Sequence, residues 1–447
     1  MYIDFLLDMF SKNKDRVAMI WQDKIYTYQD LLEYIDFDIK ILKEWFPKSK
    51  VVAVEADFSP QSTAVLLCLI ELGCTIVPLT KSVANKKDEF MEIAEVEYLL
   101  NVKADDKFEI RKTERKSKHE ILRKLKTEKH PGLILFSSGS TGKSKAAVHD
   151  FLPLLDKFKV YRKCMRMITF LLFDHIGGIN TLFYVLSNAG CIVALQSRKA
   201  EDVCRSIEKY KVEALPASPT FINLLLLSEA YKKYDIGSLK LVTYGTEVMP
   251  ESTLKRFHAL FPDIRLQQTY GLSELGIMRS KSKASDSLWV KVGGEDFETR
   301  IVDGILEIKA KSAMLGYLNA PSPFTDDGWF HTGDEVLADG DYIKILGRKS
   351  EIINVGGQKV FPAEVESVLL QMDEVDDASV IGETSAITGQ IVKARVKLSS
   401  NETVAAFKKR MRLFCKEKLE SYKIPQKVEI TDQLMVGERF KKMRRES

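Results

Sequence analysis

The chain has 447 residues, more than one simple hydrophobic core usually holds, so we expect two or more domains. Hydrophobic residues make up 45% and charged residues 29% of the sequence, which excludes a largely disordered chain. The net charge of +4, from 67 basic and 63 acidic residues, gives no electrostatic reason to expect nucleic-acid binding.

The sequence shows no targeting or membrane-spanning pattern. The first ten residues carry two aspartates and no basic run, so we expect no signal peptide. The longest apolar stretch, Ala64 to Leu79, is interrupted by Glu71 and Gly73 and is too short to span a bilayer. The six cysteines form no C-x-x-C pair, which indicates reduced thiols in a cytoplasmic protein.

The first hundred residues predict a parallel sheet. Thr27 and Asp30 have the spacing of a helix start that is capped from both sides. Residues 51–54 and 74–78 are typical of buried strands, with a helix from about Ser62 between them. Strand, helix and strand at this spacing indicate a parallel β-α-β unit.

The rest of the chain divides by character. Lysine and arginine crowd residues 102–130, which we interpret as a solvated helix or loop and not a binding arm. Short apolar runs then alternate with helical patterns up to about Leu346, as in a large α/β domain. Beyond it we expect a small α+β domain, with helices at 363–371 and 402–419 and strands at 377–381 and 391–397. The predicted domains are residues 1–346 and 347–447.

A loop of small residues follows the apolar run Leu133–Phe136. Small residues let a backbone approach a phosphate chain, and their N–H groups and hydroxyls can donate to its oxygens. The loop of nucleotide hydrolases needs a glycine where Ser137 stands and a helix afterwards, but residues 146–148 are typical of a strand. The expected phosphate-contacting residues are Ser137, Ser138, Gly139, Ser140, Thr141, Gly142 and Lys145, with added charge from Lys143.

This strand–loop–strand pattern resembles the adenylate-forming superfamily, which contains acyl-CoA synthetases, peptide-synthetase adenylation domains and luciferases. Ser144 stands where that family has proline. The resemblance implies a large N-terminal α/β domain with mixed parallel sheets, and a small mobile α+β C-terminal domain. It covers nearly the whole chain, although the part before the loop is short for the family.

Further motifs of this family follow in order. Residues 269–274 resemble its Y-G-x-S-E motif, in which Glu274 would hold Mg²⁺, because a hard cation prefers carboxylate oxygen. Residues 244–247 resemble the turn around adenine, and residues 331–334 resemble the T-G-D motif, whose aspartate accepts hydrogen bonds from the ribose. The resemblance assigns nucleotide binding to Gly245, Thr246, Glu247, Tyr270, Gly271, Ser273, Asp334 and Arg348.

The predicted small domain carries two more motifs. Gly356 and Gly357 resemble the glycine loop that faces the thiol channel, where the backbone must leave room for a narrow arm. Ser350 stands at the family's hinge position. The resemblance places the catalytic lysine at Lys441, with Lys442 as the alternative, and Phe440 where the family has glycine. Arg444 and Arg445 are interpreted as a solvated basic tail. The predicted catalytic residues are Lys441, Lys145, Glu274 and His175, the last bordering the acyl pocket.

The resemblance implies an AMP-forming acid–thiol ligase that uses ATP and Mg²⁺. It would activate a carboxylic acid as acyl-AMP and transfer the acyl group to coenzyme A, as in fatty acid metabolism. One alternative is transfer to the phosphopantetheine of a separate acyl carrier protein. Another is a non-catalytic nucleotide- or acyl-binding relative, which the changes at Ser144, Ser350 and Phe440 suggest. The acid and the oligomeric state, monomer or homodimer, stay open.

Overall fold

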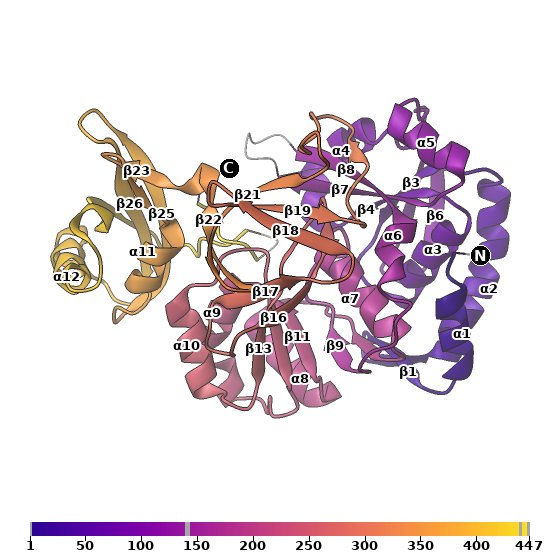
Figure 1. The fold of residues 1–447 in the computed structure, drawn as a ribbon. Helices are drawn as coiled ribbons and strands as arrows, with labels where there is room; N and C mark the ends of the chain where they lie inside the picture. Colours follow the sequence, from indigo (N-terminus) through magenta and orange to yellow (C-terminus); the bar gives the residue numbers. More distant parts are fainter. Residues whose placement is uncertain (1, 139–143, 438–439, 445–447) are drawn as a thin grey trace.

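Two seven-stranded sheets form the body of the large N-terminal domain (Figure 1). The computed structural model describes residues 2–138, 144–437 and 440–444. The first sheet has the order β20 (Gly316–Tyr317), β8 (Ser144–Asp150), β7 (Gly132–Ser138), β4 (Thr75–Leu79), β3 (Val51–Glu55), β5 (Tyr98–Val102) and β6 (Phe108–Lys112). The second has the order β13 (Arg265–Gln268), β12 (Leu241–Tyr244), β11 (Ala214–Ala217), β9 (Arg166–Ile168), β10 (Cys191–Val193), β1 (Val17–Trp21) and β2 (Lys24–Thr27).

Two apolar helices join these sheets into one core. Helices α3 (Pro60–Glu71) and α7 (Ile176–Ser187) bury nearly all their residues, and their side chains share one hydrophobic cluster with residues of both sheets. A helix that is apolar all round must be covered on every side, which these two positions provide. The other helices of this domain are α1 (Asp4–Lys12), α2 (Tyr28–Trp45), α4 (Lys87–Ile93), α5 (Glu120–Glu128), α6 (Phe151–Asp156), α8 (Ala200–Tyr210), α9 (Pro219–Ser228) and α10 (Glu251–Leu260).

A third, antiparallel sheet leads to the small C-terminal domain. Its order is β16 (Arg279–Ser282), β17 (Trp289–Gly293), β22 (Tyr342–Arg348), β21 (Phe330–Asp339), β19 (Ile305–Ala310) and β18 (Phe297–Val302), and the hairpin β14 (Gly271–Leu272) and β15 (Gly276–Ile277) lies just before it in the chain. The small domain contains β23 (Ile353–Val355), β24 (Gln358–Val360), α11 (Pro362–Leu369), β25 (Val375–Ser385), β26 (Gly389–Leu398), α12 (Val404–Lys416) and β27 (Lys427–Ile430). Its side chains form a separate hydrophobic cluster.

Most of the expected elements are confirmed. Thr27 and Asp30 form a capping box at the start of α2, and β3 and β4 pair in parallel across α3. Helix α3 begins at Pro60 and not near Ser62, because Ser59 caps it and proline suits the first turn. The strands and helices expected beyond 347 are present with slightly different ends. The boundary itself stays a prediction, since β22 continues through Gly347 to Arg348.

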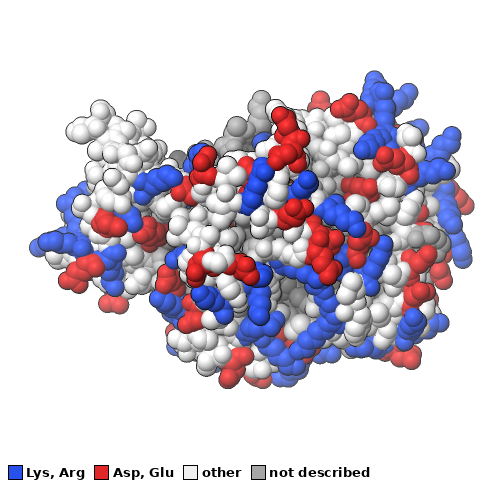
Figure 2. Space-filling view, in the orientation of Figure 1, with Lys and Arg blue, Asp and Glu red and all other residues white. Residues whose placement is uncertain are grey.

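The charged segment 102–130 differs from the expectation of a helix or loop. It contains an edge strand, β6, which pairs with β5, before the exposed helix α5. Edge strands tolerate charge because one side of the strand faces solvent. Figure 2 shows basic side chains gathered at the upper right, where α5 and β6 lie, and both signs of charge mixed over the rest of this face. Within the described ranges, no helix is long and apolar enough to cross a membrane.

Candidate active site

The expected phosphate loop joins two strands of one hairpin. In the β7–β8 pair, Ser137 lies opposite Lys145 and Ser138 opposite Ser144. A strand resumes at Ser144, so the strands expected on both sides are confirmed, and the helix required by the nucleotide-hydrolase loop is absent from residues 144–150. The predicted residues Gly139, Ser140, Thr141, Gly142 and Lys143 lie outside the described residues.

Lys145 and Glu274 meet through a tyrosine that sequence reasoning missed. The Nζ atom of Lys145 lies 5.3 Å from the centre of the Tyr317 ring, and the Tyr317 hydroxyl donates to Oε1 of Glu274 at 2.7 Å. Because β20 pairs with β8, Tyr317 lies opposite Ala147, close to Lys145 along the hairpin. A cation and a carboxylate from distant parts of the chain therefore contact one tyrosine, the cation at its ring and the carboxylate at its hydroxyl.

A second buried residue supports the segment that carries Glu274. His149 on β8 is fully buried, and its Nε2 lies 2.6 Å from the carbonyl oxygen of Ser273. Burial lowers the pKa of His149, so the neutral ring is favoured, with Nε2–H as the donor to this carbonyl. His149 thus ties the Ser273–Glu274 turn to the phosphate-loop hairpin.

Tyr270, Asp334 and Arg348 form a polar cluster where the pairing of β21 and β22 ends in the third sheet. The Tyr270 hydroxyl donates to Oδ2 of Asp334, and Nε of Arg348 lies 3.4 Å from Oδ1. Asp334 and Arg348 are direct partners on β21 and β22, which explains their contact. Thr332, the first residue of the T-G-D motif, accepts from the Asp334 N–H at 3.0 Å, a role that the sequence did not assign. Burial raises the pKa of Asp334, while the Arg348 guanidinium opposes that rise.

The turn expected around adenine follows β12. Thr246 takes a φ of +75°, a left-handed conformation that a β-branched residue rarely adopts and that is found at functional sites. Its Oγ1 is buried without a hydrogen-bond partner in the described part of the chain. Glu247 instead accepts from two backbone N–H groups, those of Thr220 at 2.8 Å and Lys442 at 2.9 Å.

A pocket next to this turn is lined by residues from both domains. His175 caps α7, where its Nδ1 accepts from the Gly177 N–H at 3.0 Å, and it lines this pocket. The wall is otherwise mostly apolar, and the C-terminal residues reach it from the small domain. The lining residues are Phe170, Leu171, Leu172, His175, Thr246, Phe440 and Lys441.

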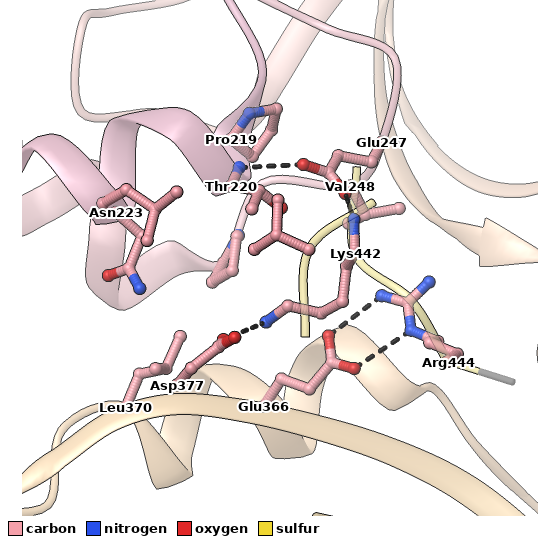
Figure 3. A pocket seen from close by; sticks show the side chains of 13 residues that line it. Pro219, Thr220, Asn223, Glu247, Val248, Glu366, Leu370, Asp377, Lys442 and Arg444 are labelled. Atoms are coloured by element: carbon pink, nitrogen blue, oxygen red, sulfur yellow. Dashed lines mark hydrogen bonds and ion pairs between the residues drawn. The ribbon is translucent and has the colours of Figure 1, made fainter. Parts of the chain in front are cut away.

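The two candidate lysines face different surroundings. They belong to a C-terminal hairpin, residues 435–444, whose strands bridge at Val436 and Lys442; residues 438 and 439 lie outside the described part. Lys441 lines the pocket, whereas the Nζ of Lys442 turns into the small domain, where it lies 2.6 Å from the Ala378 carbonyl oxygen. Figure 3 shows its ion pair with Asp377, whose Oδ1 is 3.3 Å away.

Arg444 corrects the interpretation of a solvated tail. Its guanidinium forms two hydrogen bonds to Glu366, at 3.0 and 2.9 Å (Figure 3). A third hydrogen bond joins it to Glu351 at 2.7 Å. Only 1% of the Glu366 side chain is exposed. Burial raises the pKa of Glu366, but Arg444 and Lys442 outweigh burial and the net pKa is lowered. The sequence hid this pair because its partners lie 78 residues apart. Arg445 lies outside the described residues.

Gly356 and Gly357 form the turn of the β23–β24 hairpin. Their φ values of +58° and +88° are those of a two-residue turn that glycine adopts without strain. A Cβ at either position would meet no heavy atom within 4 Å, so the turn is open. The turn is not part of the pocket that Lys441 lines. Ser350 lies in a short 3-10 helix, Lys349–Glu351, directly after β22.

A family model identifies the class of protein to which this fold belongs. Residues 8–303 match the AMP-binding enzyme family, and residues 364–441 match the AMP-binding enzyme C-terminal domain. The first match covers more than half of the chain. The chain therefore belongs to the AMP-binding enzyme family.

Curated relatives are 26–28% identical to this chain over the regions that match. It is 28% identical to a (methyl-dioxo-octahydroindenyl)propanoyl:CoA ligase of Rhodococcus jostii over 67% of this chain and 61% of that protein. It is 28% identical to a long-chain-fatty-acid–CoA ligase of Haemophilus influenzae over 57% of this chain and 48% of that protein. An indoleacetate–CoA ligase of Aromatoleum aromaticum is 26% identical over 68% of this chain and 64% of that protein. The matches thus span about half to two thirds of these relatives.

Solved structures share the fold over almost the full length. An anthranilate CoA ligase in complex with anthranoyl-AMP superimposes with a TM-score of 0.80 at 19% identity, covering 98% of this chain and 95% of that one. An o-succinylbenzoate CoA synthetase of Bacillus subtilis with its acyl-adenylate gives 0.77 at 20% identity, covering 99% of this chain and 97% of that one. These comparisons confirm the predicted two-domain architecture.

Proposed function

We propose that this protein is an AMP-forming acid–CoA ligase. The observation that carries the proposal is the pocket at which Lys441 of the small domain meets His175 and Thr246 of the large domain. The positive charge of Lys441 lies between the turn expected around adenine and an apolar pocket. A cation in this place can assist the reaction of a carboxylate with a phosphate. The relatives named CoA ligases support the same reaction class.

In the first half-reaction, a carboxylate oxygen attacks the α-phosphorus of ATP, a new O–P bond forms, and pyrophosphate leaves. Both reactants are anions, so a cation between them lowers their repulsion and stabilises the transition state. Lys441 has this role in our proposal, while Lys145 at the phosphate-loop hairpin balances charge on the departing phosphates. Asp334, held by Tyr270 and Arg348, accepts from the ribose hydroxyls, and the unpartnered Oγ1 of Thr246 lies where the resemblance places adenine.

The residues present fit a magnesium ion that arrives with the triphosphate. Among the described residues, no group of three or more His, Cys, Asp or Glu side chains could hold a metal alone. Mg²⁺ characteristically uses one or two carboxylates together with substrate phosphates and water. Glu274, oriented by Tyr317, is the carboxylate that we assign to it. When bound, the ion would neutralise phosphate charge.

The second half-reaction transfers the acyl group to a thiol and releases AMP. The thiol sulfur attacks the acyl carbon, and the bond between that carbon and the AMP oxygen breaks. We propose coenzyme A as the acceptor, and a carrier-protein phosphopantetheine is the alternative. The open turn at Gly356 and Gly357 is the segment that would border the thiol arm after the small domain rotates about Ser350. The six free cysteines agree with our proposal of a cytoplasmic location.

ATP–pyrophosphate exchange with a panel of carboxylic acids tests this function. Because Phe170, Leu171 and Leu172 line the pocket, acids with apolar acyl groups should support exchange best. Coenzyme A and a phosphopantetheinylated carrier protein, added separately to the best acid, then identify the acceptor. If ATP binds but no acid supports exchange, the non-catalytic alternative is correct.

A further inference from the structure

Phe440 occupies a backbone position that suits glycine. Its φ is +52°, in the left-handed region, and the resemblance to the adenylate-forming superfamily expects glycine here. A phenylalanine gains nothing from this conformation by itself. Contacts of its side chain or backbone must therefore hold it there.

The side-chain contacts of Phe440 come from the large domain, while its N–H donates to the Gly437 carbonyl oxygen within the hairpin at 2.9 Å. The Phe440 ring lies 5.2 Å from the ring of Phe170 and 6.0 Å from that of Phe221, centre to centre, at interplanar angles of 57° and 84°. Such tilted and edge-on arrangements are favourable for aromatic pairs. The Ser218 hydroxyl donates to the Phe440 carbonyl oxygen at 2.6 Å. A residue of the small domain's C-terminal hairpin is thus packed against a hydrophobic cluster of the large domain.

The packing of Phe440 against the large domain determines where the residues that follow it lie. Lys441 comes next and lines the pocket beside His175 and Thr246. The Lys442 N–H then donates to Glu247 of the large domain at 2.9 Å, while the Lys442 side chain stays bound to Asp377 of the small domain (Figure 3). Lys441 is therefore fixed from both sides, by an aromatic anchor before it and a backbone hydrogen bond after it.

We propose that Phe440 is a positioning residue that anchors the C-terminal hairpin in the large domain and holds Lys441 at the pocket for the first half-reaction. This inference rests on the proposed function. The ring must leave its apolar seat before the small domain can rotate for thiol transfer, so Phe440 favours the adenylating arrangement over the thiol-transfer arrangement. Glycine at this position supplies the backbone shape without the anchor.

Separate assays of the two half-reactions test the proposal on Phe440→Ala, Phe440→Gly and Phe440→Leu. The alanine and glycine variants should lower kcat for ATP–pyrophosphate exchange by about 10- to 100-fold, because small displacements of a catalytic group are costly. Thiolysis of added acyl-AMP should stay unchanged or become faster. Leucine refills the seat and should recover most of the exchange rate. Leu434→Ala, which removes a 42% exposed apolar side chain from the sequence just before the hairpin, is the matched control.

Hydrogen exchange gives a readout that does not need the enzyme's substrates. In Phe440→Ala, the amide of Lys442 should exchange faster than in the wild type and in Leu434→Ala, because its interdomain hydrogen bond to Glu247 opens more often. An unchanged rate of amide hydrogen exchange at Lys442 in Phe440→Ala would overturn the anchoring role of Phe440. Equal losses of adenylation and thiolysis in a folded Phe440→Leu would overturn it as well. If the wild type shows no pyrophosphate exchange, the proposed function fails while the amide measurement still decides the anchor.

Discussion

At the scale of single residues, neighbours in sequence have opposite surroundings. Lys441 lines the pocket between the domains, and the Lys442 side chain, 7% exposed, is paired with Asp377 inside the small domain. Both are lysines in one basic run, so the sequence alone does not show which of them faces the pocket. The hairpin bridge between Val436 and Lys442 distinguishes their surroundings, because successive residues of a paired strand point to opposite faces.

Substituting each lysine should therefore give different defects. Lys441→Ala should lower adenylate formation about 10²- to 10³-fold, the usual effect of removing a charge-stabilising group, and leave thiolysis of acyl-AMP intact. Lys442→Met should cost about 3 kcal/mol of folding free energy, because Asp377 loses its buried cation. Half-reaction rates and urea unfolding of both variants test the assignment. A selective loss of adenylation in Lys442→Met, with Lys441→Ala still active, would assign the catalytic role to Lys442 instead of Lys441.

At the scale of elements, α2 and α3 are joined by a pair of buried carboxylates. Asp38 of α2 is 1% exposed and Asp106, after β5, is 7% exposed. Gln61 of α3 connects them, since its side chain donates to Asp38 and its N–H donates to Asp106. Burial raises the pKa of Asp38 to about 7, and the nearby Asp106 charge adds to that rise.

This pair predicts a pH dependence of stability. The folded-state pKa of Asp38 is above its unfolded value, so its favourable contribution is present at low pH and is lost as pH rises through about 7. The asparagine of Asp38→Asn stays neutral, so the free energy of unfolding of this variant should rise relative to that of the wild type by about 2 kcal/mol as the pH is raised from 5.5 to 8.5. Denaturant unfolding of both proteins at these two pH values measures the gain. A constant difference between them would show that Asp38 does not titrate in this range.

At the scale of the whole molecule, the two domains meet through the C-terminal hairpin and through direct contacts such as the hydrogen bond from the Ser252 N–H to Ser367. The small domain has its own hydrophobic cluster, so it can turn as a unit. In the structure, Lys441 is at the pocket and the Gly356–Gly357 turn is not among its lining residues. We expect rotation of the small domain to move Lys441 away from the pocket and to bring the Gly356–Gly357 turn to it.

Gly357→Leu tests that exchange. The turn is open in this arrangement, so pyrophosphate exchange should stay within about twofold of the wild type after the modest backbone strain of a left-handed non-glycine residue. Transfer to coenzyme A should fall about 10-fold or more, because the new side chain would obstruct the thiol arm. Single-turnover transfer from acyl-AMP measures this directly. An equal effect on both steps would argue against rotation.

The sequence by itself determined the local features. The capping box at Thr27, the strands on both sides of the phosphate loop and the parallel β3–α3–β4 unit follow from short-range residue patterns, and the structure confirms them. The ordered motifs were also enough to predict the family. Patterns of this kind are readable because hydrogen bonding within a few residues produces them.

Only the tertiary structure decided which distant residues support the site. Tyr317 joins Lys145 to Glu274, His149 holds Ser273, and Arg444 pairs with Glu366, each across a long separation in sequence. Their roles come from strand pairing and from the burial of charge, and neither leaves a local pattern. The same reason explains Phe440, which is a departure from its family in the sequence and becomes an interdomain anchor once β9, α9 and the C-terminal hairpin are packed together.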